Sequence, residues 1–272
     1  MPITGAYVNV QGIKTYYETN NGPHNPKGTI IALPTAGRES RQFHGIMEYL
    51  EDRYTVIAPD LPAHGKSWPL PGLQGIKTYQ EYGKFVWDFI QTLGIEDPVV
   101  LGCSFSGNMV LHIASTYPVK AAIACQASSY IKAMGSSYGT TILLLDNPYV
   151  SPQHSHWDFS ESLIGRDCPK EAHDLIMWGV CQEIGRAKIA DMSIYNNFDV
   201  REDLKNLTCP LLLVRGEDDW NVPDHYFETA MEYITNSRKL EFKKVPRYGH
   251  FIVVEAPAVV SELIDEFLPE EA

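Results

Sequence analysis

The chain has 272 residues, of which 22 are lysine or arginine and 34 are aspartate or glutamate, so its formal net charge at pH 7 is −12. An acidic surface repels phosphate backbones and anionic headgroups, so we expect neither a nucleic acid nor a membrane as a partner. No apolar run approaches the ~20 residues of a membrane span, and the N-terminus lacks the basic and apolar segments of a signal peptide. We therefore expect a soluble, cytoplasmic protein.

Length and cysteine spacing narrow the organisation further. The chain exceeds the ~150 residues that are typical of one domain, yet α/β folds of about 250 residues commonly share a single core. We therefore expect one domain that carries an insertion. The five cysteines are odd in number and include no C-x-x-C pair, which indicates neither a disulfide framework nor a zinc site. We expect reduced, mostly buried thiols at positions 103, 125, 168, 181 and 209.

Strands and helices alternate in the first part of the chain. A helix is expected over residues 40–50, and Thr78 with Glu81 forms a capping box before a helix that has one apolar face. The strand patterns cover residues 7–10, 13–18, 29–33 and 54–59, the first two forming a hairpin.

The run from Val99 to Gly107 is a buried strand that ends in a tight turn before a helical pattern. Small residues let such a turn close, and the residue at its apex is held in strained geometry at the carboxyl end of the strand. Ser104 occupies that apex and is a candidate nucleophile. Ser106 stands where the G-x-S-x-G pattern has its last glycine. The alternative interpretation is an ordinary serine in a strand-to-helix turn.

The alternation breaks in the second half of the chain. A buried strand over residues 121–127 is followed by a long stretch without an obvious strand, in which 147–155 has the composition of a loop and 175–194 has a helical pattern. A buried strand returns over 210–216, and another strand is expected over 240–246. The stretch between these strands therefore indicates an insertion.

Polar turns follow both of the later strands. Asp218 and Asp219 come after the first strand, and His250 comes after the second. The chain order is therefore serine, acid, histidine, each at the carboxyl end of a separate strand.

This order of residues resembles that of the α/β-hydrolase family, and the resemblance covers essentially the whole chain, from about residue 7 to residue 268. The segment from Asp60 to Ser67 is similar to the D-x-x-x-x-G-x-S turn of that family. The resemblance implies an α/β fold with a mostly parallel, doubly wound sheet and a largely helical cap. In this organisation residues 1–128 and 208–272 form the core, and residues 129–207 form the cap, which covers the nucleophile and chooses the substrate.

The chemistry of acyl transfer assigns a role to each residue of the series. A serine hydroxyl is a weak nucleophile at neutral pH, so Ser104 needs a base, and an imidazole with a pKa near ~6.5 suits that task. His250 is the expected base. An acid must hold the imidazole in the right tautomer, and the family position selects Asp219, with Asp218 as the rival. The other position that the family uses, after the strand that ends near residue 127, offers no carboxylate.

The resemblance also implies an oxyanion hole made of two backbone N–H groups. One belongs to Phe105, directly after the nucleophile. The other comes from the loop after residue 33, where Ala36 is the expected donor and Thr35 is the alternative. The family usually has His-Gly where this chain has Pro34 and Thr35, and a proline lacks an N–H and stiffens the loop. The Thr35 hydroxyl is expected either to contact substrate or to bond within its own loop.

Large aromatic side chains in the insertion and beside the acid are candidates for an apolar substrate pocket, with core packing as the alternative. His154 and His156 lack a metal-ligand arrangement, so no metal is expected. We expect Cys103 to point into the sheet as a small buried side chain. The candidates for substrate contact are three of these aromatic residues, Trp157, Trp178 and Trp220, together with Thr35.

The sequence therefore predicts a hydrolase that cleaves a small carboxylic ester or lactone through an acyl-enzyme, without a metal or organic cofactor. Its expected partner is a small-molecule substrate. The same three residues also serve thioester or amide cleavage and carbon–carbon bond hydrolysis of a vinylogous diketone, and these alternatives stay open. A serine at the apex of the nucleophile turn argues against halide or epoxide chemistry, for which the family uses aspartate at this position. A ligand receptor and a cofactor-free oxygenase on the same fold are the alternatives from a different class.

Overall fold

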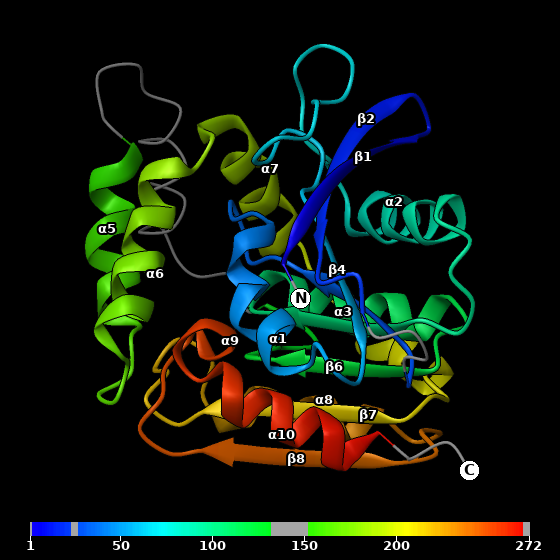
Figure 1. The fold of residues 1–272 in the computed structure, drawn as a ribbon. Helices are drawn as coiled ribbons and strands as arrows, with labels where there is room; N and C mark the ends of the chain where they lie inside the picture. The colour runs from blue at the N-terminus through cyan, green and yellow to red at the C-terminus, as the bar shows by residue number, and fades with distance from the viewer. Residues whose placement is uncertain (1, 23–26, 132–151, 269–272) are drawn as a thin grey trace.

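The computed structural model describes residues 2–22, 27–131 and 152–268. Within these residues, eight strands form one sheet in the order β1-β2-β4-β3-β5-β6-β7-β8 (Figure 1). The β1–β2 and β2–β4 pairs are antiparallel, and every other neighbouring pair is parallel. The strands are β1 (Thr4–Val10), β2 (Ile13–Thr19), β3 (Thr29–Leu33), β4 (Thr55–Pro59), β5 (Val99–Cys103), β6 (Ala121–Cys125), β7 (Leu211–Gly216) and β8 (Leu240–Val245).

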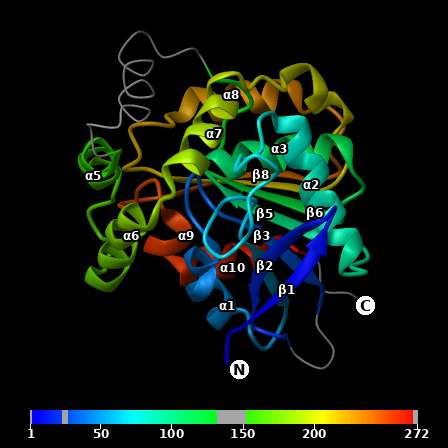
Figure 2. The same cartoon turned by 90° about the horizontal axis from the view of Figure 1, so that it is seen from above.

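Helices cover both faces of the sheet (Figure 2). Successive side chains of a strand point to opposite faces, so Ile31 and Leu33 join one apolar layer while Ile30 and Ala32 join the other. This double coverage explains the continuous apolar runs of the parallel strands and confirms the predicted doubly wound sheet. The first layer lies under α2 (Tyr79–Thr92), α3 (Phe105–Thr116) and α8 (Asp224–Tyr233), and the second lies under α1 (His44–Tyr49), α9 (Ile252–Glu255) and α10 (Pro257–Phe267).

The predicted hairpin, the buried strands and the capped helix are all present. The Glu81 N–H donates to the Thr78 side-chain oxygen at 3.2 Å, so Thr78 caps α2 as expected. The predicted helix over residues 40–50 is instead a 3₁₀ turn, η1 (Ser40–Phe43), followed by α1. β6 ends at Cys125, two residues earlier than predicted, because Gln126 has a φ of +48° and turns the chain out of the sheet.

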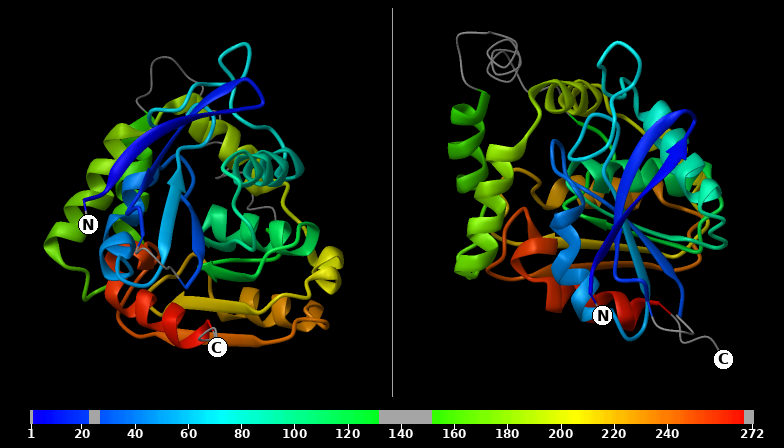
Figure 3. Two further views of the ribbon diagram at one scale, coloured as in Figure 1. Left: turned by 45° about the vertical axis from the view of Figure 1, so that its right-hand side comes forward. Right: turned by 45° about the horizontal axis from the view of Figure 1, so that its top comes forward.

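The described part of the insertion between β6 and β7 is helical. It contains α5 (Pro152–Ser162), α6 (Lys170–Gln182), α7 (Gly185–Asn196) and η2 (Arg201–Asn206). Helices α5 and α6 stand side by side at one end of the sheet, toward which the β8 arrow points in Figure 1, and Figure 3 shows the same arrangement from two further directions. None of the described helices is long and apolar enough to cross a bilayer.

Two predictions for the insertion are wrong. The loop predicted over residues 147–155 is helix from Pro152 onward, because proline and serine also suit the first turn of a helix; residues 147–151 lie outside the described residues. The single helix predicted over 175–194 is interrupted, since Glu183 and Ile184 are extended and Gly185 is a poor helix former.

Gly102 marks a close approach between β5 and α3. A Cβ added there would lie 2.3 Å from the Ser106 backbone oxygen. Gly102→Ala should therefore lower the free energy of unfolding by roughly 1–3 kcal/mol. Gly28→Ala is the matched control, because its Cβ meets no atom within 4 Å, and we expect a change of less than about 0.5 kcal/mol. Urea denaturation followed by circular dichroism measures both values, and equal losses would contradict the close approach.

Candidate active site

Ser104 lies at the apex of the turn between β5 and α3. Its φ of +59° and ψ of −123° are rare for a residue with a side chain, and the surrounding hydrogen bonds hold this conformation. The Ser104 N–H donates to the Cys125 carbonyl at 2.9 Å, and the Ser104 carbonyl accepts the Asn108 N–H at 3.0 Å. The turn therefore presents the hydroxyl at the carboxyl end of a central strand, as the sequence predicts.

His250 follows β8, and Asp219 follows β7. The His250 Nε2 lies 2.6 Å from Ser104 Oγ, and its Nδ1 lies 2.7 Å from Asp219 Oδ2. The second oxygen of Asp219 accepts the Asn221 N–H at 2.8 Å. All three side chains are buried. The structure thus brings Ser104, His250 and Asp219 into one hydrogen-bonded series.

The chemistry of these partners determines the direction of each hydrogen bond. A carboxylate accepts only, so the Nδ1 of His250 carries the proton that points to Asp219. The Nε2 is then free to accept from the Ser104 hydroxyl. This is the arrangement in which an imidazole removes the proton of a serine as the serine attacks.

Asp218 points away from His250. Its carboxylate receives two hydrogen bonds from the Arg166 side chain, at 2.9 Å from Nε and 2.7 Å from Nη2. The same guanidinium lowers the pKa of Asp218 below its usual value. Of the two acids that the sequence leaves as rivals, Asp219 is the one that touches the imidazole.

Cys103 is buried beside the turn and directs its thiol at the protein interior. Its Sγ donates to the His250 carbonyl at 3.3 Å, and burial raises the pKa of the thiol to about 12. A thiol with so high a pKa is almost entirely protonated at neutral pH, and only the thiolate is a good nucleophile. Cys103 therefore packs the site, as expected from the sequence.

The loop after β3 lies next to the nucleophile turn. The Thr35 N–H donates to Gln42 Oε1 at 2.8 Å, so this N–H is already occupied, which favours Ala36 over Thr35 as the oxyanion donor. The Thr35 hydroxyl donates to the Cys103 carbonyl at 3.0 Å and so serves the loop itself. Phe105 is the first residue of α3, where backbone N–H groups have no partner within the helix. The roles of Ala36 and Phe105 as oxyanion donors stay predictions.

Ser106 has a function that the sequence analysis missed. Its buried hydroxyl donates to the Pro34 carbonyl and lies 2.9 Å from the Tyr82 hydroxyl. It therefore connects the loop after β3, the nucleophile turn and α2. The signal in the sequence was the serine in place of the last glycine of the G-x-S-x-G pattern.

Glu255 is a second residue that the sequence analysis missed. One carboxylate oxygen accepts the Gly249 N–H at 2.8 Å and the Gly165 N–H at 2.9 Å, and the other accepts the Phe251 N–H at 3.0 Å. Burial raises the pKa of Glu255, and the three N–H donors oppose that rise. The carboxylate holds both neighbours of His250 and so fixes the position of the imidazole.

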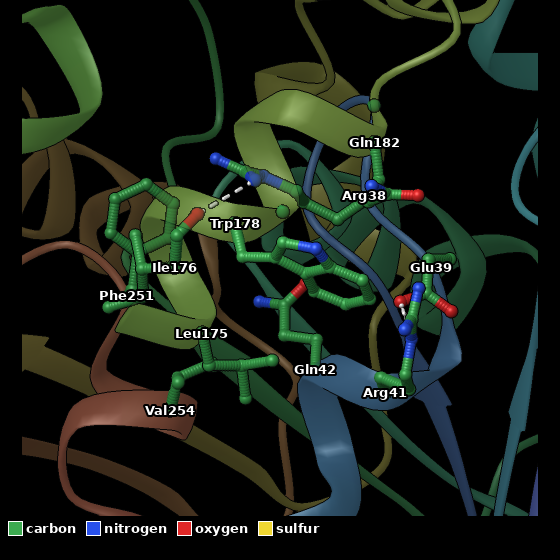
Figure 4. A pocket seen from close by; sticks show the side chains of 12 residues that line it. Arg38, Glu39, Arg41, Gln42, Leu175, Ile176, Trp178, Gln182, Phe251 and Val254 are labelled. Atoms are coloured by element: carbon green, nitrogen blue, oxygen red, sulfur yellow. Dashed lines mark hydrogen bonds and ion pairs between the residues drawn. The ribbon is translucent and has the colours of Figure 1, made fainter. Parts of the chain in front are cut away.

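The three tryptophans of the predicted substrate pocket lie on α5, on α6 and after β7. Trp178 lines a pocket beside the loop after β3 and reaches toward Gln42 and Arg41, with the Arg41 guanidinium 3.9 Å from its ring centroid (Figure 4). Trp220 is 55% exposed and donates to the Ser162 carbonyl at 2.9 Å, and Trp157 is 40% exposed. Their contact with substrate stays a prediction.

No group of three or more His, Cys, Asp or Glu side chains in the described residues could hold a metal ion. The side chains of His154 and His156 lie outside the described part of the chain. All five cysteines are free thiols, with Cys103, Cys125 and Cys209 buried and Cys181 exposed.

The three hydrogen bonds that Glu255 accepts can be tested by their contribution to stability. Glu255→Gln keeps the shape but turns one acceptor oxygen into an N–H donor that faces a backbone N–H. We expect the free energy of unfolding to fall by about 1–3 kcal/mol. The exposed Glu262→Gln, on α10, should leave it within about 0.5 kcal/mol. Thermal unfolding followed by circular dichroism measures both, and an unchanged Glu255→Gln would show that the carboxylate does not anchor the turn.

Comparison with known proteins agrees with this architecture. A family model described as alpha/beta hydrolase fold matches residues 28–137. The uncharacterized hydrolase YugF of Bacillus subtilis is 27% identical over 95% of this chain and 96% of its own length, and the putative carbamate hydrolase RutD of a Caulobacter species is 24% identical over 94% and 96%. The solved enol-lactonase of Burkholderia xenovorans LB400 superposes with a TM-score of 0.82 at 14% identity, over 96% of this chain and 99% of that one. The chain is therefore a hydrolase with the α/β-hydrolase fold.

Proposed function

We propose that this chain cleaves a small carboxylic ester or lactone through an acyl-enzyme on Ser104. The observation that carries the proposal is the hydrogen-bonded series from Ser104 Oγ through both nitrogens of His250 to Asp219 Oδ2. A nucleophile, a base and an orienting acid at these distances are the groups that acyl transfer requires.

The reaction begins with attack of Ser104 Oγ on the carbonyl carbon of the substrate. Its proton passes to His250 Nε2, and Asp219 stabilises the imidazolium that forms. The carbonyl oxygen becomes negatively charged, and the N–H groups of Ala36 and Phe105 stabilise it. His250 then gives its proton to the leaving alkoxide as the carbon–oxygen bond breaks. In a lactone the leaving alkoxide stays attached to the acyl group, so the product is one hydroxy acid.

Water completes the cycle. His250 removes a proton from a water molecule, which attacks the acyl-enzyme, and the same proton returns to Ser104 Oγ as the acid leaves. Each step moves protons between side chains and substrate alone, so the proposed reaction needs no metal or organic cofactor.

The burial of the site supports a small substrate. Ser104 is 8% exposed and His250 is 3% exposed, and cap helices stand at this end of the sheet. The similarity to an enol-lactonase supports the fold, and the geometry of the triad supports acyl transfer as the reaction.

A panel of short-chain esters, lactones, thioesters and vinylogous diketones, assayed with one enzyme preparation, tests the proposal. Wild-type enzyme should hydrolyse an ester or a lactone with multiple turnovers, and Ser104→Ala should lower kcat by roughly 10⁴-fold or more. A fluorophosphonate should label Ser104 alone. Turnover of thioesters or diketones alone would assign the enzyme to that substrate class instead. Labelling of Ser104 without multiple turnover of any member of the panel would favour a ligand receptor.

Replacing each of the two acids by asparagine, one at a time, tests the role of Asp219. Asp219→Asn should lower kcat by about 10⁴-fold, since the amide favours the wrong tautomer of His250. Asp218→Asn, whose side chain contacts Arg166 instead, should change kcat by less than about tenfold. Both values are measured on one ester that the wild-type enzyme hydrolyses. The reverse ranking would assign the acid to Asp218.

A further inference from the structure

One peptide group of the loop after β3 is held from both sides by helix α7 of the cap. Lys188 Nζ donates to the Ala36 carbonyl at 3.0 Å, and Asp191 Oδ2 accepts the Gly37 N–H at 2.8 Å. Lys188 and Asp191 are three residues apart, so they lie on the same face of α7. A cation and an anion thus bind the two polar atoms of the peptide that joins Ala36 to Gly37.

Both side chains have little access to water. The exposed fraction is 14% for the side chain of Lys188 and 5% for that of Asp191. Charges at such positions lose hydration, and they are retained in folded proteins when other charges or hydrogen bonds compensate them. Lys188 is compensated by Glu183 Oε1 at 3.1 Å, and Asp191 is compensated by His64 Nε2 at 2.8 Å.

His64 is positively charged in this arrangement. Its Nδ1 lies 3.1 Å from the Pro62 carbonyl, and its Nε2 lies 2.8 Å from Asp191 Oδ2. Both partners accept hydrogen bonds and cannot donate them, so both ring nitrogens carry protons. Burial lowers the pKa of His64, but the neighbouring Asp191 carboxylate outweighs it and raises the pKa above the ordinary value. The same Asp191 oxygen thus faces the His64 ring and accepts the Gly37 N–H.

The held peptide is adjacent to the N–H that the proposed mechanism uses. Fixing the Ala36 carbonyl and the Gly37 N–H limits rotation about the backbone of Ala36, and Gly37 has a φ of +74°. An oxyanion donor acts only when it points at the charge that develops in the transition state. The contacts of α7 therefore bear on the direction of the Ala36 N–H.

Cap docking alone does not account for these contacts. Arg166 with Asp218 and Arg247 with Asp167 already connect the cap to the core at the exposed surface, away from the loop after β3. The α7 side chains instead bind successive polar atoms of a single peptide. Among the cap contacts of the described residues, this pair is directed at the backbone of the candidate oxyanion loop.

We propose that Lys188 and Asp191 are positioning residues for the oxyanion hole, through which the cap contributes to transition-state stabilisation in addition to covering the site. The inference rests on the proposed acyl transfer by Ser104. Neither residue touches the reacting atoms, and each acts through the Ala36–Gly37 peptide.

The test compares Lys188→Met and Asp191→Asn with two matched controls in the same cap. The controls are Lys170→Met and Asp174→Asn, whose side chains pair with each other on α6 and are 79% and 58% exposed. Each variant is assayed for kcat and KM on an ester that the wild-type enzyme hydrolyses. The Ki of a matching trifluoromethyl ketone is measured as well, because its serine adduct carries a tetrahedral oxyanion. Active-site titration with a fluorophosphonate counts the intact sites.

We expect Lys188→Met and Asp191→Asn to lower kcat per intact site by about ten- to a hundredfold, below the ~10²–10³ that loss of a whole oxyanion donor causes. KM should stay within about threefold, and the Ki of the ketone should rise in proportion to the fall in kcat/KM. A merely structural role would lower the number of intact sites and leave the kcat and the Ki of the remaining sites unchanged. The controls should match the wild-type enzyme in all four measurements.

Asp191→Asn leaves His64 without its anion, so Lys188→Met is the decisive variant if Asp191→Asn fails to fold. A kcat and a Ki within threefold of wild type in Lys188→Met would overturn the inference. Loss of folded protein in both variants, with both controls intact, would also overturn it in favour of cap attachment. Failure of the proposed function is a separate result, because it is seen in the wild-type enzyme, which then neither hydrolyses an ester nor reacts with the fluorophosphonate.

Discussion

The arrangement of the site depends on one turn, Tyr248 to His250, that lies against the backbone of Gly165 and Gly216. The Gly249 carbonyl accepts from Gln126 Nε2 at 2.7 Å, and the His250 N–H donates to the Leu163 carbonyl at 2.9 Å. A Cβ added at Gly249 would lie 2.1 Å from that same Leu163 carbonyl. The turn therefore joins the residue after β6 and the segment between α5 and α6 to the histidine.

Buried carboxylates act throughout this protein as anchors for backbone N–H groups. Asp60 accepts the Ser40 N–H at 2.8 Å and the Lys66 N–H at 2.7 Å, and the Ser67 hydroxyl donates to the Asp60 carbonyl at 2.6 Å. The D-x-x-x-x-G-x-S segment thus folds around the Asp60 side chain and is hydrogen-bonded to the start of η1. Asp191, Asp219 and Glu255 also accept backbone N–H groups. Each carboxyl group is buried, and backbone N–H dipoles take the place of the water that it loses.

The sequence predicts those parts of the site that local patterns determine. Ser104, Asp219 and His250 each follow a strand of the parallel part of the sheet, so parallel pairing alone brings them to one edge of the sheet. Glu255 and Asp191 have no such pattern, because their partners Gly165 and Gly37 are distant in the chain. Short motifs are enough to predict the turns. Only the folded structure shows which distant backbone N–H groups donate to a buried carboxyl group.

The contact between α7 and the loop after β3 bears on how this fold diversifies. Caps are usually considered interchangeable modules that alter substrate choice while the core keeps the chemistry. Here two charged side chains of α7 bind the backbone of the loop after β3, beside the predicted oxyanion donor. Selection on the cap would then act on reaction rate and on specificity together. Recombination of caps among relatives would have to carry over a compatible α7 along with the residue that faces it at position 64.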